Sequence, residues 1–423
     1  MILLFGLFFI LLIIGTSIAN SMFISSIIYM IYYGLPLEMI PQRMAAGVDS
    51  FTLLAVIFFV LAGALMNRGG ITTRIFTLAE KCVGHYTGGL AHANVLASII
   101  FAGMSGSAIA DTGGLGAIEL KAMKDGGYDE DFSLAITGAS SLIGPVIPPS
   151  VPLVLFGVTA SQSVGDLFNA GIIPGILLGI IMMVVNYFIC RKRNYGVSPK
   201  ASLKEVLKCF IWAFWAIFLV VIIRGGIAFG VFTPTEAAVI AVAYAIILGL
   251  IYKAVKIKEL PSVIKETLGT SVSVLYILSA ATLFSWILTY EQIPQTIAGY
   301  LIGLTDNALL LLLIIMLILL FVGLFMDITP AIVILTPILL PAVSAVGIDL
   351  IWFGVIMILC LLVGLITPPV GMVLFVLSGI SDVPIAKISR AIAPYLVASI
   401  GVILLIIFYV YLMTLNPSLP KLY

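Results

Sequence analysis

The chain has 423 residues, of which 62% are hydrophobic and 9% are charged, and its mean hydropathy is +1.27. A soluble domain carries about 25% charged residues, so this chain lacks the polar surface of a soluble protein and must be surrounded largely by lipid. The apolar residues form long uninterrupted runs, which favours helices over a β-barrel. The formal net charge of +1 gives no reason to expect a nucleic-acid partner. The sequence therefore predicts an all-α polytopic membrane protein.

The first apolar segment, 2–19, has no positive region before it and no clear cleavage site. We interpret it as a membrane helix rather than a signal peptide. Further apolar segments follow at 21–35, 50–67, 88–104, 132–161, 166–190, 209–230, 234–252, 269–290, 307–325, 330–346, 350–380 and 391–414. Several are too short or too rich in Gly and Pro to be simple spans. They predict two re-entrant helical hairpins, at 88–123 and 305–348, and two broken helices, at 132–161 and 350–380.

The lysines and arginines of the loops indicate orientation, because these residues are retained on the cytoplasmic side. They gather at 191–208, at 253–268 and on both sides of the first hairpin, whereas none lies between Lys265 and Lys387. This pattern predicts that the first hairpin enters the membrane from the cytoplasm and the second from outside, with both termini periplasmic. Opposite entry of two similar hairpins is typical of inverted-topology repeats.

Three amphipathic segments, at 71–84, 254–267 and 292–303, mix apolar and polar residues at helical spacing. We predict that they are helices lying along the membrane interface. For the last of the three, an ordinary connecting loop is an alternative.

An internal repeat connects the two broken helices. Gly144 aligns with Gly364, and the proline pair 148–149 aligns with 368–369, at an offset of 220 residues. Proline removes a backbone donor and frees a carbonyl one turn earlier. Unwound backbone at membrane depth is tolerated only where it lines a cavity or coordinates something. Free carbonyls with hydroxyls suit Na⁺, and the N-termini of half-helices favour an anion.

The tip of the first hairpin, 103–114, is small and polar and carries Ser105 and Ser107. It can place backbone and hydroxyl oxygens beside the first break, and Ser107 aligns with Asp327 at the same offset. The alternative is helix packing by small residues. The flanking Asp111 favours a ligand site, although Asp111 itself is interpreted as a cap or a hydrogen-bond partner of the tip.

Asp327 follows the apolar segment 307–325 and precedes Pro330. An intramembrane carboxylate with no basic residue nearby is costly unless it meets a cation, hydroxyls or water. We therefore predict a contact with substrate or sodium. The alternative is a helix N-cap, for which Thr329 is the better candidate.

The remaining polar residues suggest no catalysis. The histidines and cysteines are too scattered for a metal site, and no phosphate-binding loop or catalytic triad is present. Glu236 lies in a capping-box pattern. Five acids are interpreted as a solvated cluster at the cytoplasmic end: Glu119, Asp125, Asp129, Glu130 and Asp131.

Four strings resemble the large membrane subunit of tripartite ATP-independent periplasmic (TRAP) transporters, over essentially the whole chain. They are GMSGSAIADTGGLGAIELKAMKDGGYDEDF, GPVIPPSVPLVLFG, GLFMDITPAIVILTPILLPAV and GLITPPVGMVLFVLSGIS. The resemblance implies a sodium-driven importer of an organic anion, of the sialic-acid or C4-dicarboxylate class, in the bacterial cytoplasmic membrane. The GGLG and IELKAM strings lean towards the sialic-acid branch.

The resemblance also implies two protein partners, a periplasmic substrate-binding protein and a small four-helix membrane subunit. Because the chain leaves no room for that subunit before its first span, a separate small chain is expected. An elevator-type ion-transporter fold is implied as well. Its transport domain would comprise 88–165 and 304–383, its scaffold helices and interfacial arms 1–87 and 166–303, and its C-terminal helix 384–423.

Carried over to this chain, the resemblance implies at least two sodium ions with substrate between them. The first sodium site would combine Ser105 and Ser107 with Gly144, Ile147 and Pro149. The second would combine Gly323 and Asp327 with Gly364, Thr367 and Pro369. Substrate would lie near Ser105, Ser150 and Asp327. Ser150 becomes Val370 in the second repeat, so the halves are not equivalent there.

Two other functions remain open. A stand-alone ion-coupled carboxylate carrier or exporter of related fold could use the same hairpins and broken helices. A channel-like pore is a further alternative, although two discrete broken segments argue against it.

Overall fold

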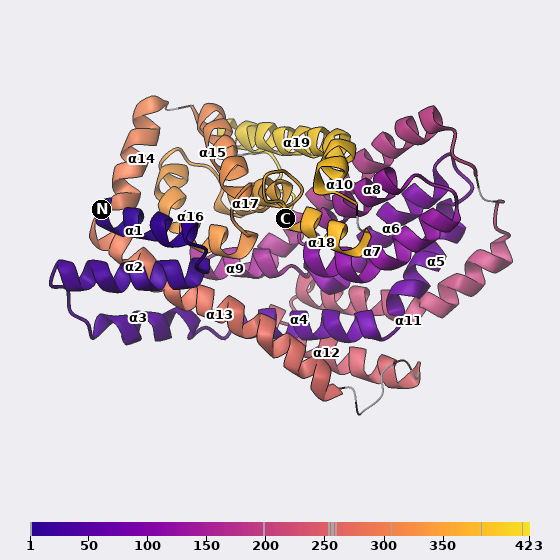
Figure 1. Ribbon diagram of the computed structural model, residues 1–423, viewed down its shortest axis with the longest axis horizontal. Helices are drawn as coiled ribbons and strands as arrows, with labels where there is room; N and C mark the ends of the chain where they lie inside the picture. Colours follow the sequence, from indigo (N-terminus) through magenta and orange to yellow (C-terminus); the bar gives the residue numbers. More distant parts are fainter. Residues whose placement is uncertain are drawn as a thin grey trace.

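The computed structural model describes residues 2–197, 199–252, 254, 258, 260–305, 307–381, 383–416 and 418–423, without the side chain of Ser105. Every regular element within these ranges is a helix (Figure 1), as the composition predicts. The first five are α1 (Ile2–Ile13), α2 (Ile18–Tyr32), α3 (Met39–Val48), α4 (Leu53–Arg68) and α5 (Ile71–Val83). Six of the described helices are long and apolar enough to cross a membrane: α10, α11, α12, α13, α16 and α19. A seventh span is possible if α3 and α4, bent by 54° at their junction, count as one.

The first predicted hairpin and broken helix form a continuous set of helices. The chain turns back between α6 (Gly89–Ser105) and α7 (Ala108–Asp125), which pack against each other. The broken helix follows as α8 (Glu130–Ser140), one 3₁₀ turn (Ser141–Ile143), an irregular stretch at 144–150, and α9 (Val151–Ala160). The long helix α10 (Val164–Arg193) ends this half.

The second half repeats this order. It contains α11 (Leu203–Ala228), α12 (Pro234–Ile251), α13 (Leu260–Tyr290), α14 (Ile293–Leu304), α15 (Ala308–Gly323), α16 (Ile328–Ala345), α17 (Leu350–Leu365), α18 (Met372–Ser381) and α19 (Ile385–Leu415). The 220-residue offset relates the starts of α7 and α16, and those of α8 and α17. In both halves the Pro-Pro peptide bond at the break is cis. The repeat seen in the sequence is therefore also a repeat of structure.

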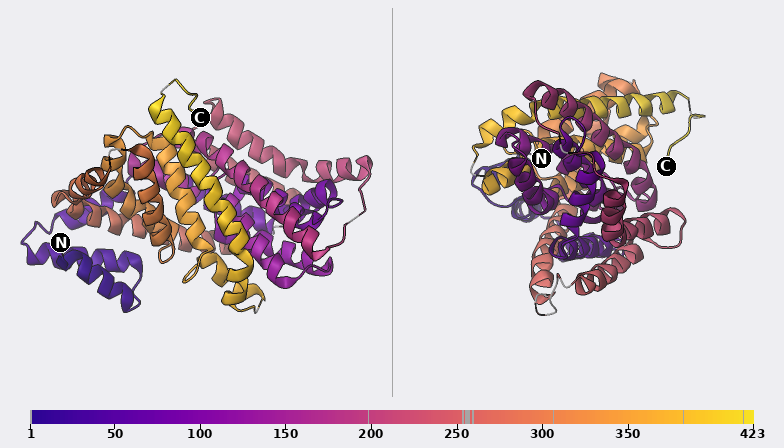
Figure 2. Two further views of the ribbon diagram at one scale, coloured as in Figure 1. Left: turned by 90° about the horizontal axis from the view of Figure 1, so that it is seen from above. Right: turned by 90° about the vertical axis from the view of Figure 1, so that its right-hand side faces the viewer.

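The two halves interlock. The returning helix of each hairpin packs against the second segment of the other half's broken helix, α7 against α18 and α16 against α9. The long helices α10 and α19 pack against each other and against both α8 and α17 (Figure 2). Outside this group, α4 packs on α12 and α13, and α13 packs on α2 and α3.

One predicted element was wrong. The segment 254–267 was expected to be a separate interfacial helix, but α13 begins at Leu260 and continues without a break to Tyr290. A helix tolerates Gly269 because one interior glycine costs only about 1 kcal/mol, and nothing crowds that position. Residues 253, 255–257 and 259 lie outside the described part of the chain. The other two segments are helices α5 and α14, and their position at a membrane surface stays a prediction.

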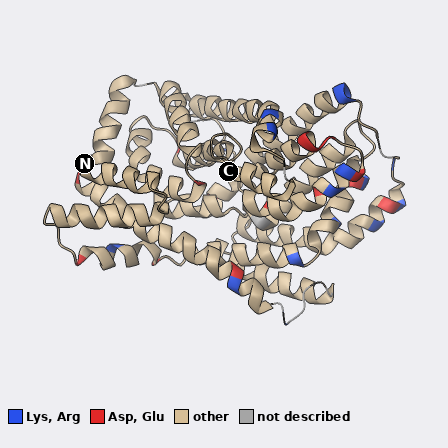
Figure 3. Ribbon diagram, viewed as in Figure 1, with Lys and Arg blue, Asp and Glu red and all other residues tan. Residues whose placement is uncertain are grey.

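The charged residues gather mostly at one end of the molecule, around α5 and α8 (Figure 3). Glu119 is an exception to the predicted solvated cluster, because it is only 1% exposed. Its burial could not be anticipated from its neighbours in sequence, because it depends on how α6 and α8 pack against α7.

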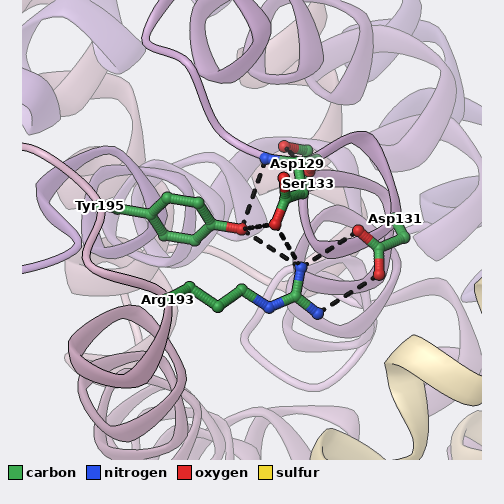
Figure 4. A network of polar contacts seen from close by, with 5 residues as sticks. All are labelled: Asp129, Asp131, Ser133, Arg193 and Tyr195. Carbon is green, nitrogen blue, oxygen red and sulfur yellow. Dashed lines mark hydrogen bonds and ion pairs between the residues drawn. The ribbon is translucent and has the colours of Figure 1, made fainter.

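Asp129, the residue before α8, is held by the end of α10 (Figure 4). Arg193 Nη1 lies 2.7 Å from Asp129 Oδ2 and 3.2 Å from Asp131 Oδ1. The Tyr195 hydroxyl donates to Asp129 Oδ2 at 2.7 Å. We call these four residues the Asp129 cluster.

Asp349, the N-cap of α17, lies 220 residues after Asp129 and has the same kind of partners. Lys421 Nζ lies 3.1 Å from Asp349 Oδ2, and the Tyr423 hydroxyl donates to the same oxygen at 2.8 Å. In each half, a basic residue and a tyrosine two residues later therefore contact the acid that begins the broken helix. These two residues lie at the end of the long helix or beyond it.

We predict that Arg193→Gln and Asp129→Asn each lower the apparent melting temperature in detergent by a small amount. Exposed ion pairs contribute about 0.2–1 kcal/mol. Because both changes remove the same contact, the double variant should be less destabilised than the sum of the two single variants. Fully additive losses in a thermal melt would show that Arg193 and Asp129 do not stabilise each other.

This contribution should also depend on pH. The Tyr195 hydroxyl and the Arg193 guanidinium lower the pKa of Asp129. A lowered folded-state pKa stabilises the protein above the unfolded value, about 3.9, and that contribution is lost as the pH falls through the folded value. The difference in melting temperature between wild type and Asp129→Asn should therefore shrink below about pH 4.

Candidate functional site

The tip of the first hairpin lies against the first break. Gly106 makes the turn between α6 and α7 with a left-handed φ of +60°. A Cβ added to Gly106 would lie 2.7 Å from the Pro149 carbonyl oxygen and 3.4 Å from the Ser150 Cα. This position therefore needs glycine for two reasons, its conformation and the close approach of another backbone segment.

The N-termini of two helices meet at this contact. Ser107 caps α7, accepting from the Ala110 amide at 3.4 Å, and Ser150 caps α9, accepting from the Leu153 amide at 3.2 Å. The Ser150 hydroxyl also donates to the Pro145 carbonyl. Because the positive ends of both helix dipoles point to the same region, the arrangement favours negative charge there.

Asp111 lies against the first break, whereas the cap of α7 is Ser107. Asp111 is 2% exposed, and a Cβ added to Gly144 would lie 2.1 Å from its Oδ2. A carboxylate oxygen therefore occupies the space that a side chain at residue 144 would need. In the sequence, this contact is indicated by the spacing of Ser107 and Asp111, which are four residues apart and therefore lie on the same face of the helix.

The tip of the second hairpin lies against the second break in a similar way. A Cβ added to Gly364 would lie 2.3 Å from both the carbonyl carbon and the carbonyl oxygen of Gly323. At the break, the Thr367 hydroxyl donates to the Val363 carbonyl at 2.6 Å. The backbones of the tip and the break thus touch in both halves.

Asp327 is half-buried at the N-cap position of α16, but its side chain makes no capping hydrogen bond. The expectation that Thr329 caps this helix was wrong, because Thr329 lies within the first turn. No salt bridge to Asp327 is found among the described residues. Its carboxylate therefore has no ionic partner among the described residues.

The two breaks differ in burial. Residues 141–150 are all buried, whereas Pro368 and Pro369 are exposed. In the first break, Ile147 packs so tightly on α10 that a Cβ at Gly175 would lie 2.2 Å from its Cγ1. The predicted ligands that the first break supplies, Gly144, Ile147 and Pro149, are therefore enclosed, while those of the second break are partly open. The predicted role of the Ser105 side chain lies outside the described atoms.

Arg224 is a contact that the sequence did not reveal. From α11, its Nε donates to the Pro148 carbonyl at 3.1 Å, which joins a helix of the predicted scaffold to the first break. Arg224 is half-buried. The only signal in the sequence is a single basic residue in an otherwise neutral stretch that was predicted to be external.

A cavity of about 600 Å³ separates α4 and α13 from the beginning of α7. Ser107 borders it at the hairpin tip, and at another border Arg68 Nη2 lies 2.6 Å from Glu266 Oε2. Its other polar lining residues are Asn67, Thr267 and Thr270. The cavity is of the size that small-molecule sites have, and it reaches the tip of the first hairpin.

Comparison with known proteins places these features in a family. Residues 5–412 match the family model described as the tripartite ATP-independent periplasmic transporter, DctM component. The chain is 47% identical over 379 residues to the sialic acid TRAP transporter large permease protein SiaM of Vibrio cholerae, which covers 89% of each protein. It is 39% identical over 409 residues to the sialic acid TRAP transporter permease protein SiaT of Haemophilus influenzae, covering 96% of this chain and 66% of that one.

The fold is also similar to that of a solved transporter. The crystal structure of the Alcanivorax borkumensis YdaH transporter superposes with a TM-score of 0.63, at 15% identity, over 88% of each chain. This likeness concerns the arrangement of the helices alone.

We predict that Gly364→Ala strongly reduces the folded yield and the melting temperature of the protein. The new methyl group would meet the Gly323 backbone at 2.3 Å, and overpacking costs about 1–3 kcal/mol or more where backbone must move. Gly379→Ala is the matched control, since nothing lies within 4 Å of a Cβ there. A Gly364→Ala variant as stable as Gly379→Ala would contradict the close approach of tip and break.

Proposed function

The chain belongs to the DctM component family of tripartite ATP-independent periplasmic transporters, and we propose that it is a sodium-coupled importer of an organic anion. Transporters of this family work with a substrate-binding protein and a small membrane subunit. The observation that supports the proposal most is the contact of each hairpin tip with a broken helix. Two such contacts provide paired sites in which an ion can be bound together with a substrate.

The first proposed sodium site combines oxygens of the first tip and the first break. Carbonyl and hydroxyl oxygens are the hard ligands that such a cation prefers. The proposed residues are Ser105, Ser107, Gly144, Ile147 and Pro149. The burial of the break favours tight binding, because an ion held there is shielded from water.

The second proposed sodium site combines Gly323 and Asp327 with Gly364, Thr367 and Pro369. Here the cation would be balanced by a carboxylate, which accounts for a half-buried Asp327 without a salt bridge among the described residues.

The proposed substrate is an organic anion bound between the two sites, near Ser105, Ser150 and Asp327. The converging N-termini of α7 and α9 favour its negative charge. Two relatives named as sialic acid transporters support that class, and a C4-dicarboxylate is the alternative. Both classes carry the carboxylate that the helix N-termini would stabilise.

The proposed movement is an elevator motion. Because the hairpins and broken helices interlock, with α7 on α18 and α16 on α9, they are suited to move as one body against α4 and α13. The cavity between α4, α7 and α13 contains Arg68, which lies on the cytoplasmic side by the loop charges. We propose that this cavity is the exit path of the substrate.

The proposed partners are a periplasmic substrate-binding protein and a small membrane subunit as a separate chain. SiaT is longer, and this chain spans 66% of it. SiaT is therefore the relative to compare for a small subunit fused to the large one. The proposed location is the bacterial cytoplasmic membrane with both termini periplasmic.

The direct test is uptake of radiolabelled substrate into proteoliposomes that contain the chain and its small subunit. We expect uptake only when an inward sodium gradient and the added binding protein are both present. Uptake without the binding protein would favour a stand-alone carrier. A conductance without coupling to sodium would favour a pore, and either result would overturn the proposal.

We predict that Asp327→Asn reduces sodium-driven uptake at least tenfold while the protein still folds. Asparagine keeps the shape of the side chain but removes the charge proposed to hold the cation. Asp125→Asn, at an exposed position after the first hairpin, should transport normally. Wild-type uptake by Asp327→Asn, with equal amounts of protein in the vesicles, would refute this role.

We also predict that Ser105→Ala weakens the response to sodium, raising the concentration for half-maximal uptake several-fold because one hydroxyl ligand is lost. Ser273→Ala removes an exposed hydroxyl that donates only to its own helix, to the Gly269 carbonyl, and serves as the control. An unchanged sodium activation curve for Ser105→Ala would count against the first site.

A further inference from the structure

Glu119 is a buried acid in a polar cluster that the proposed transport cycle does not use. Asn94 of α6 donates from Nδ2 to Glu119 Oε2 at 2.8 Å and to Thr137 Oγ1 of α8 at 2.9 Å. The Ser140 hydroxyl donates to Asn94 Oδ1 at 2.7 Å. Each of these four side chains is at most 1% exposed. We call them the Glu119 cluster.

One oxygen of the cluster has no hydrogen-bond partner among the described residues. Glu119 Oε1 is buried and forms no hydrogen bond with any of the described residues. A buried polar atom without a hydrogen-bond partner destabilises the folded protein, and more strongly if it is charged. The cost would be relieved by a proton or a metal ion on that oxygen.

The described part of the chain supplies no countercharge for this carboxylate. Glu119 forms no ion pair there, and the charged group that acts on it is another acid, Asp111. Lys121 and Lys124, on the same helix, are exposed. Burying an ionised carboxylate without a cation is strongly unfavourable, so the ionised form needs a positive charge that the described residues do not supply.

The neighbouring helices do not change this conclusion. The sequences of α8 and α18 and of the 3₁₀ turn contain no basic residue. The basic side chains of α4, α5 and α6 act on other groups: Arg68 pairs with Glu266, Arg74 lies over Trp212 and Tyr252, Lys81 acts on Glu205, and His92 contacts the Thr87 carbonyl.

We propose that Glu119 is the carboxylate of a further monovalent-cation site, where a bound proton or sodium ion neutralises the buried charge. A proton needs only Oε1. A sodium ion needs more oxygens, and the cluster can provide them. Rotation of the Asn94 amide by 180° exchanges its nitrogen for its oxygen at nearly the same place, so that Glu119, Thr137 and Asn94 would all present oxygen.

This site is separate from the two proposed at the hairpin tips. Glu119 lies eight residues beyond Asp111 on α7, or about 12 Å at 1.5 Å per residue. The cluster joins both helices of the first hairpin to α8, and its member Ser140 directly precedes the 3₁₀ turn that leads to the break at Gly144. A cation bound here would therefore hold the hairpin on the broken helix, and its release would loosen that contact.

The test is thermal unfolding of the purified full-length chain in detergent, which measures binding without transport. Wild type and Glu119→Gln are melted across a range of pH with choline as the sole cation, and again across NaCl concentrations at the highest pH. Glutamine keeps the side-chain shape and can still accept from Asn94. Glu130→Gln, which changes an exposed acid of α8, is the matched control.

If the occupant is a proton, wild type should lose stability as the pH rises, because the folded state binds the proton more tightly than the unfolded state. Glu119→Gln should lack the part of this loss of stability that comes from deprotonation of residue 119. If the occupant is sodium, NaCl should restore the stability of wild type at high pH. The concentration for half-maximal stabilisation should then rise at least tenfold in Glu119→Gln, or the effect should vanish.

A second variant and a second measurement guard against a folding defect. Thr137→Val keeps the volume of residue 137 and should weaken the sodium response while leaving a proton response in place. Infrared difference spectra of wild type on sodium addition or pH change should show the band of a protonated carboxyl gained or lost, and Glu119→Gln should lack it.

Identical pH and NaCl dependence in wild type and Glu119→Gln, with no difference in the carboxyl band, would overturn this site. A failure of sodium-driven uptake in wild-type proteoliposomes would overturn the proposed function instead. The melting experiment distinguishes the two, since it requires neither a substrate nor a partner protein.

Discussion

The satisfaction of backbone polar groups away from water is the constraint on which this structure depends. Within a bilayer an unpaired backbone group costs several kcal/mol, yet the chain unwinds twice inside long apolar helices, at 144–150 and at 366–371. Each break is met by the backbone of a hairpin tip, at Gly106 in one half and at Gly323 in the other. The hairpin tips therefore cover the unwound backbone before any ligand is considered.

The same constraint explains where glycine is required. The tip and break backbones approach so closely that Gly106 and Gly364 leave no room for a Cβ, whereas Gly379 and Gly269 lie in open surroundings. It also explains the placement of the acids. Asp111 fills the space beside Gly144 in the first half. In the second half Asp327 begins the returning helix, so equivalent positions carry different chemistry.

Much of the fold follows from patterns that are local in sequence. Apolar runs, Gly-Pro interruptions and the 220-residue offset are sufficient to place both hairpins and both breaks, because each depends on backbone chemistry within a few residues. The continuity of α13 does not follow in this way, since the composition of 254–267 resembles an interfacial helix while the cost of Gly269 is small. Segment type was predictable, and segment length was not.

The side-chain environment of the site was less predictable than its backbone. The burial of Glu119 arises from the packing of α7 with its neighbours α6 and α8, and the contact of Arg224 with the Pro148 carbonyl joins segments 76 residues apart. Counting the charges near a loop predicts the same solvent exposure for Glu119 and Asp129. Only packing separates Asp129, which pairs with Arg193 at the surface, from Glu119, which α6 and α8 enclose.

This separation of the acids has a mechanical consequence. The Asp129 and Asp349 contacts fasten the beginning of each broken helix to the end of a long helix or to the chain beyond it, where water is near and ion pairs are weak. Towards the breaks, the described contacts are backbone approaches and side-chain hydrogen bonds, and Glu119 and Asp327 form no ion pair among the described residues. This part of the molecule is therefore held mainly by packing and hydrogen bonds. Binding of a cation there can alter the stability of the hairpin contacts far more than the same ion could at the surface, which gives ion binding a direct physical route to conformational change.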